Sequence, residues 1–325
     1  MPGVLIIAKK EFKDHVSDKT FLLCFAALLI VMVGGALYMI QSFQAMNYVL
    51  AGQNYRDLAG EIVEKDEIWK STDYLFTDLV AGQLSSIGVL LTIAMSLSTV
   101  HKERKEGTLR VLLSYPVYRD NLFFGKLLGG FAVLFIASIV SMVISFSLLM
   151  FYMAIPITAD FLLRIITTSL MSTLLLVFFL CLGIIGSYLL PDTSSILLSL
   201  VLILALLQYE NYYVLIVAGY NLLSFMGVNL PKLGLYYRGL GTDRWDDVLY
   251  RTFCKLSPTE SYLKLSERLL NFGYDNDYNM YHTNFASFSF QDQLIGNIDL
   301  TATLIIFTVA AVVSSYIIST RRELP

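Results

Sequence analysis

The chain has 325 residues, of which 56% are hydrophobic and only 15% are charged, and its formal net charge is −3. With a mean hydropathy of +0.65, it lies outside the range of an ordinary water-soluble domain and inside that of a protein with several membrane spans. The small net charge by itself decides little, so the placement of the charges carries the argument.

Several apolar runs are long enough to cross a bilayer, whose hydrocarbon core of about 30 Å needs roughly 20 helical residues. The runs are continuously apolar rather than alternating, which favours helices over a barrel. We therefore predict an all-α membrane protein with six transmembrane helices, at residues 21–43, 79–100, 127–153, 161–190, 195–213 and 300–320. Its parts would be an N-terminal helix (1–20), five spans (21–225), an outer segment (226–299) and a last span with its tail (300–325).

The segment 1–20 has an amphipathic pattern. Apolar residues recur near helical spacing and lysines stand beside them: Leu5, Ala8, Phe12 and Val16, with Lys9, Lys10 and Lys13. This pattern predicts a helix lying flat on the inner membrane surface, and the alternative is a solvated tail. The apolar run that follows is longer than the core of a signal peptide and lacks an A-x-A exit, so we expect it to remain as the first span.

A charged segment at 101–126, HKERKEGTLRVLLSYPVYRDNLFFGK, separates the second and third spans. Gly107 and Thr108 can begin a short helix that Pro116 ends, which predicts a stiff rod at the membrane face. Asp120 or Asn121 is expected to cap the next helix. That helix carries Gly125 and Gly129 at the small-xxx-small spacing that allows close helix packing.

Positive charge sets the expected orientation. The segments on the side of the N-terminus hold Lys9, Lys10, Lys13, Lys19, Lys102, Arg104, Lys105, Arg110, Arg119, Lys126, Arg321 and Arg322, whereas the short segments on the other side hold Arg56, Lys65, Lys70 and Arg164. Both termini are therefore expected in the cytoplasm of a multi-pass plasma-membrane protein. Arg164 is expected to extend toward the outer headgroups.

The expected outer regions leave two questions open. Residues 214–225 are too short to span and are interpreted as re-entrant or interfacial. The segment 226–299 is rich in Tyr and Trp, which fits either a layer on the lipid headgroups or a surface for an outer accessory protein.

Polar residues within the spans suggest a translocation path. Glu210 is an intramembrane acid, a functional candidate by default, although a Glu near the interface satisfied by its neighbours is the alternative. Ser85 and Ser86 could line a polar path between subunits, or their hydroxyls could bond to their own helix, which is the commoner role. Cys24, Cys181 and Cys254 form no C-x-x-C pattern, and the three histidines lie far apart, so we expect no metal site.

One motif resembles a known family. The pattern E-x-x-x-G-T-L-x-x-L-L-S-x-P-V-x-R, then G-K-x-x-G, is similar to the permease subunit of ABC-2 type transporters and is formed by Glu103, Gly107, Thr108, Leu109, Leu112, Leu113, Ser114, Pro116, Val117, Arg119, Gly125, Lys126 and Gly129. The segment AKKEFKD at 8–14 resembles the elbow helix of that family, particularly of its NosY-like group. LSPTESYLKLSERLLN at 256–271 resembles its outer segment.

The resemblance implies a homodimer or pseudo-dimer of six-helix subunits, each docked to a separate ATP-binding subunit through the helix within 101–126. The residues that it implies for coupling are Glu103, Glu106, Gly107, Thr108, Leu109, Arg110 and Pro116. The chain has no G-x-x-x-x-G-K-[ST] phosphate loop, so ATP and Mg would be bound by the partner and this chain would hold no cofactor and would not be an enzyme. No nucleic-acid partner is expected.

We therefore expect a permease subunit of an ATP-driven transporter, working as an exporter. A membrane scaffold that transmits force to an outer partner is the main alternative. An intramembrane enzyme is a further one, although the spans contain no H-E-x-x-H, no paired acids and no Ser/His arrangement. The sequence leaves the substrate unidentified.

Overall fold

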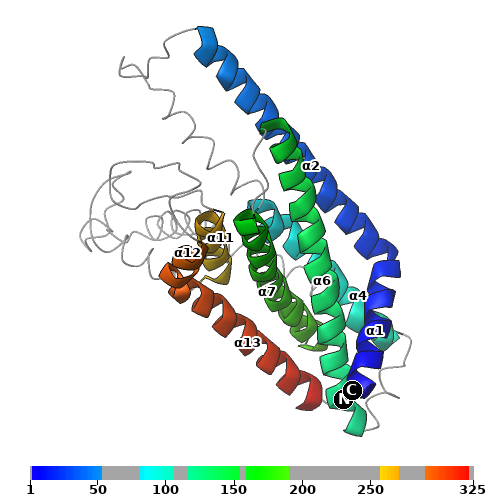
Figure 1. Cartoon of the computed structure of the whole chain (residues 1–325). Coiled ribbons are helices and arrows are strands. Elements are labelled where there is room, and N and C mark those ends of the chain that lie inside the picture. Colours follow the sequence, from blue (N-terminus) through cyan, green and yellow to red (C-terminus); the bar gives the residue numbers. More distant parts are fainter. Residues whose placement is uncertain are drawn as a thin grey trace, which may run out of the picture.

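A computed structural model describes residues 2–52, 81–105, 116–153, 159–189, 257–270 and 290–321. Every regular element in these ranges is helical (Figure 1). The helices are α1 (Pro2–Ser17), α2 (Lys19–Gly52), α4 (Gln83–Lys105), α6 (Pro116–Met153), α7 (Ala159–Leu189), α11 (Pro258–Leu269), α12 (Phe290–Gly296) and α13 (Ile298–Arg321). The all-α fold class is confirmed.

Four of these helices contain a segment long and apolar enough to cross a membrane: Lys19–Leu37, Asp120–Leu148, Leu162–Leu189 and Ile298–Thr320. They correspond to the first, third, fourth and sixth predicted spans. Helix α4 corresponds to the second predicted span, and its apolar part is shorter, at Gln83–Ser96. The fifth, 195–213, lies outside the described residues, as does 214–225. The protein is a multi-pass membrane protein.

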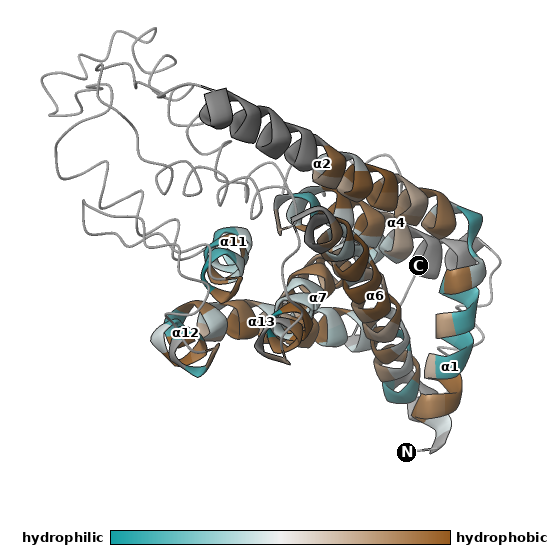
Figure 2. Cartoon of the chain, turned by 45° about the horizontal axis from the view of Figure 1, so that its top comes forward, coloured by the Kyte–Doolittle hydropathy of each residue, from teal (hydrophilic) through white to brown (hydrophobic). Residues whose placement is uncertain are grey.

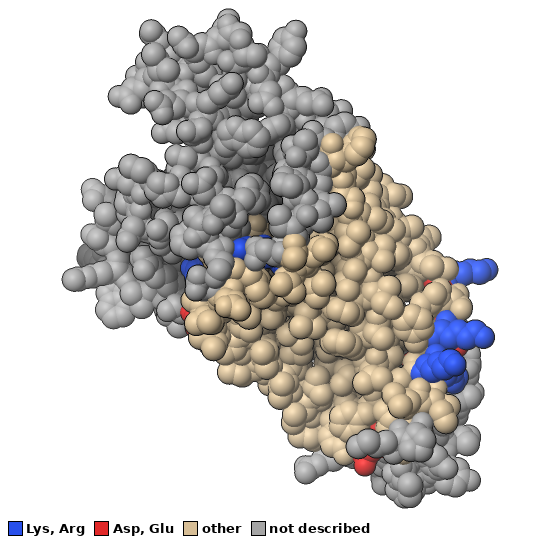
Figure 3. All heavy atoms as spheres, viewed as in Figure 1, with Lys and Arg blue, Asp and Glu red and all other residues tan. Residues whose placement is uncertain are grey.

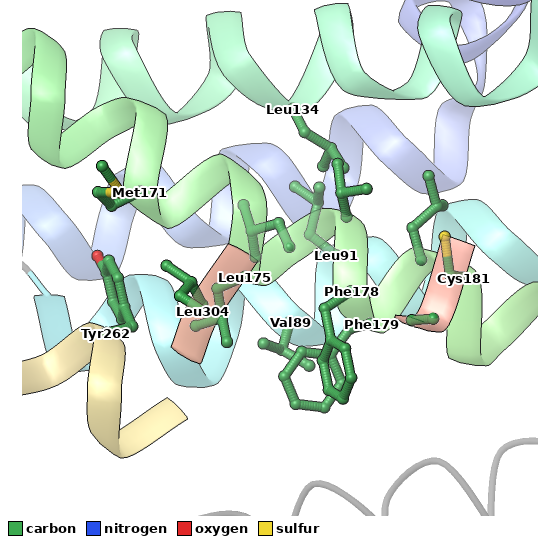
Figure 4. Close-up of a cluster of buried hydrophobic side chains, with 14 of the residues drawn as sticks. Val89, Leu91, Leu134, Met171, Leu175, Phe178, Phe179, Cys181, Tyr262 and Leu304 are labelled. Carbon is green, nitrogen blue, oxygen red and sulfur yellow. The ribbon is translucent and has the colours of Figure 1, made fainter. Parts of the chain in front are cut away.

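Helix α7 lies at the centre of the described bundle. It packs against α4, α6, α11 and α13, and α2 packs against α4 and α6. Of the apolar segment in α7, 72% is buried, against 22% for those of α2 and α13. The core is formed where α7 meets its neighbours, and Figure 4 shows Leu175 and Phe179 of α7 beside Val89, Leu91 and Leu134.

The outward faces of the peripheral helices are apolar, as the hydropathy colouring of Figure 2 shows. Leu23 and Ile30 on α2 and Ile306 on α13 are largely exposed. In Figure 3 the face of the bundle between its two ends consists almost wholly of residues other than Lys, Arg, Asp and Glu. Such a surface suits contact with lipid chains rather than with water.

Three helix boundaries differ from the sequence prediction. Helix α2 continues past residue 43 to Gly52, and α4 continues past residue 100 to Lys105. Helix α6 begins at Pro116, so the predicted cap at Asp120 or Asn121 is wrong. A proline suits the first helical position because the N–H that it lacks would have no partner there. The start of α2 has a true cap, since the Thr20 N–H donates to Asp18 Oδ1 over 3.2 Å.

We call the place where α1, the first turns of α6 and the last turns of α13 meet the terminal end of the molecule (Figure 1). We call the place where α11 packs against the start of α7 and against α13 the α11 end. Of the predicted coupling segment 101–126, the structure describes 101–105 at the end of α4 and 116–126 at the start of α6.

Candidate functional site: the junction of α1, α6 and α13

The predicted coupling residues lie on and between two described helices. Glu103 lies in the last turn of α4, and Pro116 is the first residue of α6. The remaining candidates lie outside the described residues: Glu106, Gly107, Thr108, Leu109 and Arg110. Their role stays a prediction, and the structure describes instead the helices that hold the segment at both of its ends.

Helix α1 packs along the first turns of α6 at two glycines. A Cβ added at Gly125 would lie 2.5 Å from Ile7 Cγ2. At Gly129 it would lie 2.9 Å from the Ala8 carbonyl oxygen and 2.8 Å from Glu11 Cβ. The close packing predicted from the glycine spacing is therefore confirmed, and the partner helix is the N-terminal one. Only residues without a Cβ permit this approach.

A charge pair lies beside the glycine contact. Lys126 Nζ is 3.6 Å from Glu11 Oε1, and these side chains are only 11% and 8% exposed. A charge buried to this extent is costly unless it is paired. The pair therefore favours the register in which Glu11 of α1 meets Lys126 of α6.

His15 is buried one turn further along the same face of α1. Burial lowers its pKa, and the positive charge of Lys126 lowers it further, while Asp18 and Asp14 act in the opposite direction. The neutral imidazole is therefore favoured at this junction. Glu11, His15 and Lys126 together make the contact between α1 and α6 depend on charge as well as on shape.

Helix α13 contacts the other side of α6. The Tyr316 hydroxyl donates to Asp120 Oδ1 over 2.8 Å, and the Tyr316 ring lies 5.5 Å from that of Phe123 and 5.6 Å from that of Phe124, measured between ring centroids. Asp120 is thus an acceptor for α13 rather than a helix cap. Tyr316 was not among the predicted site residues, because nothing near it in the chain indicates a partner about two hundred residues away.

The α11 end is held by an arginine. Arg164 of α7 is buried, and its Nη1 donates to the carbonyl oxygen of Leu269, at the C-terminus of α11, over 2.9 Å. The expectation that Arg164 extends to the headgroups is therefore wrong. The carbonyl groups at a helix C-terminus carry partial negative charge and lack intrahelical donors, which makes them good partners for a guanidinium.

Helix α11 lies within the segment that resembles the family's outer region. Ser257 caps it by accepting from the Glu260 N–H over 3.3 Å, and Pro258 follows the cap. Tyr262, Leu265 and Leu269 are fully buried against the rest of the bundle. Because α11 packs on α7 and α13, this part of the segment is a component of the core.

The hydroxyl groups of the two predicted path serines donate hydrogen bonds to a nearby backbone carbonyl. Ser85 Oγ donates to the Gly82 carbonyl oxygen over 2.9 Å, and Ser86 Oγ donates to the same oxygen over 2.8 Å. In α7, Thr168 and Thr173 likewise donate to carbonyls of their own helix. Glu210 lies outside the described residues, and a path through Ser85, Ser86 and Glu210 stays a prediction.

A comparison with protein families gives a match over residues 5–324, to the model of the ABC-2 family transporter protein. The chain belongs to the ABC-2 transporter family. The match includes nearly all of α1 and the whole of α6 and α13, which form the junction at the terminal end. As a family member with several apolar helices, the chain is a permease subunit of an ABC transporter. No curated protein matches its sequence.

Proposed function

We propose that this ABC-2 permease is an exporter driven by a separate ATP-binding subunit that docks on segment 101–126. The observation that carries the proposal is that α1 and α13 both fasten α6 where this segment enters it. A docking partner that displaced the segment would therefore act on three helices at once. The partner would bind ATP and Mg, and this chain would contribute no catalytic group.

Close packing between helices would pass a displacement of segment 101–126 on to the rest of the bundle. Interiors packed at native density deform little, so a contact without free space passes displacement on. Gly125 and Gly129 bring α6 into contact with α1, and Tyr316 contacts Asp120 from α13. On the other side of the segment, α4 packs against the central helix α7. Movement of the segment would thus reach the core through α4 and the periphery through α6.

The rest of the proposed arrangement is supported by the sequence pattern and by the family resemblance. Two copies of this chain would form a homodimer in the plasma membrane, with both termini cytoplasmic. Glu103, Glu106, Gly107, Thr108, Leu109, Arg110 and Pro116 would contact the ATP-binding subunit. Ser85, Ser86 and Glu210 would line the path, and an outer accessory protein would bind the segment 226–299.

The docking assignment is tested by charge reversal. We expect the Glu106→Lys, Arg110→Glu double variant to lose copurification with the ATP-binding subunit and stimulation of its ATPase. The matched control is Asp299→Lys, a charge reversal at an exposed residue at the start of α13, far from the segment. Normal assembly and stimulation in the double variant, or an equal loss in the control, would contradict docking on this segment.

The orientation has its own test. A cysteine introduced as Thr108→Cys, with Cys24, Cys181 and Cys254 replaced by serine, should react with a membrane-impermeant maleimide only after the cytoplasmic face is opened. Labelling in intact cells would contradict both the cytoplasmic placement of the segment and its docking to an ATP-binding subunit.

The export direction is tested in inverted membrane vesicles containing the assembled complex. ATP added outside should drive solute into the lumen, and movement out of preloaded vesicles would contradict export. ATP hydrolysis without solute movement would favour the force-transmitting scaffold.

A further inference from the structure

The surface of α1 that faces away from α6 combines lysines with apolar side chains. Lys9, Lys10 and Lys13 are exposed. Leu5 is 63% exposed and Ile6 is 70% exposed. We call these five residues the α1 outer face. A positively charged group of side chains at the corresponding place is visible in Figure 3.

The arrangement follows from the helix period of about 3.6 residues. Ala8, Glu11 and His15 form the buried face that meets α6. The lysines project from the opposite side, with Ile6 among them and Leu5 along one border. Lysines whose aliphatic stems lie over apolar side chains can reach a polar phase while the apolar groups remain in a less polar one.

The charge on this face is unbalanced. Of the acidic residues in α1, Glu11 is turned toward Lys126, so Asp14 is the remaining exposed carboxylate on the helix. Asp18, just beyond it, accepts from the Thr20 N–H. Three exposed lysines against one exposed aspartate leave a positive surface, which attracts an anionic partner.

The position of α1 identifies the phase that this face meets. The apolar segment of α2 begins at Lys19, directly after α1, and that of α6 begins at Asp120, in the stretch that α1 packs against. Helix α1 therefore runs beside the beginning of both apolar segments, along the turns of α6 from Asn121 to Gly129. At that level the phases next to its outer face are the lipid headgroups and the upper part of the acyl region.

We propose that the α1 outer face binds anionic phospholipid, with the lysines on the headgroups and Leu5 and Ile6 in the upper acyl region. An acidic protein surface would satisfy the lysines but leave Leu5 and Ile6 without an apolar phase. The bound lipid would hold α1 in place. Because Glu11 and the two glycine contacts join α1 to α6, lipid charge would thereby influence the junction.

The test uses the purified full-length protein in neutral detergent, titrated with phosphatidylglycerol or phosphatidylcholine and followed by native mass spectrometry. Each lysine near an anionic lipid surface strengthens binding by roughly fivefold. The Lys9→Gln, Lys10→Gln, Lys13→Gln triple variant should therefore bind phosphatidylglycerol on the order of a hundredfold more weakly. Substituting arginine at the same three positions is the matched control and should leave the affinity close to that of wild type.

Three results would overturn the proposal: equal phosphatidylglycerol affinity in the glutamine variant, phosphatidylcholine binding as tight as that of phosphatidylglycerol, or displacement of the lipid by inorganic phosphate. Raising the salt concentration with wild-type protein is a second measurement that needs no variant, and it should weaken phosphatidylglycerol binding alone. Neither ATP nor another subunit takes part, so the outcome is independent of the docking proposal.

Discussion

The two ends of the described bundle are fastened by different means. At the terminal end, α1 and α6 approach so closely that an added Cβ would meet the Ala8 carbonyl oxygen at 2.9 Å. At the α11 end, Arg164 donates to the last carbonyl of α11. The first contact combines close packing at two glycines with the ion pair of Glu11 and Lys126, whereas the second depends on a directional hydrogen bond.

The α11 end also holds several hydroxyl groups that do not meet hydrogen-bond geometry with any partner in the described structure. They belong to Thr259, Ser261, Tyr262 and Ser266. Burial raises the pKa of Tyr262, while the nearby hydroxyls of Ser266 and Ser172 act in the opposite direction. Burial likewise raises the pKa of Glu260, opposed by Lys264. Buried polar groups without bonds cost free energy, so the hydroxyls of Thr259 and Ser261 oppose the packing at this end.

Among these predictions, a larger side chain at the glycine contact of the terminal end should have the largest effect on stability. Gly129→Val should lower the free energy of unfolding by about 3 kcal/mol, because its side chain would meet the backbone of α1. Thermal unfolding of the purified protein measures this. Gly34→Val is the control, since nothing lies within 4 Å of a Cβ at Gly34. Equal destabilisation in the two variants would contradict the close packing of α1 and α6.

Removing the arginine of the α11 end should have the next largest effect. Arg164→Met should destabilise the attachment of α11 by about 2 kcal/mol, since it deletes a charge-assisted bond to a buried carbonyl. Hydrogen exchange of the α11 amides should become about thirtyfold faster. Arg164→Lys keeps the charge, and its α11 amides should exchange at a rate between those of wild type and Arg164→Met. Unchanged exchange in α11 would show that its attachment does not depend on Arg164.

Separating the charge pair at the terminal end should have a moderate effect. A double-mutant cycle of Glu11→Gln and Lys126→Met should show a coupling energy of about 1 kcal/mol, because both side chains are nearly buried at 3.6 Å. The same variants at high salt provide the control for screening. Additive effects of the two substitutions would mean that shape alone holds α1 to α6.

The smallest expected effect is a pH dependence. The pKa of His15 is lowered from its usual value of 6.5, so below that value unfolded protein binds more protons than folded protein and stability falls as the pH falls. The loss should develop as the pH falls from about 7.5 to 5.5, and it should be smaller than the effect of separating the charge pair. His15→Gln should flatten the unfolding profile over that range, and an unchanged profile would assign the dependence to another group.

Features set by neighbouring residues were predictable from the sequence, whereas contacts between distant residues were not. The length of apolar runs predicted the spans in α2, α6, α7 and α13, and the spacing of Gly125 and Gly129 predicted a close packing site. Both predictions depend only on residues that are close together in the sequence. The role of Asp120 was predicted wrongly, because a cap and an acceptor for a distant tyrosine look alike in the sequence.

The sequence by itself determined that the chain folds as apolar helices and that the charged segment 101–126 lies between two of them, since segment length and composition decide both. Only the tertiary structure decided which helices meet. It placed α1 on the glycines of α6, paired Glu11 with Lys126, and turned Arg164 inward to the end of α11. The physical reason is that such partners are chosen by packing between helices distant in the chain, and a local pattern does not encode that choice.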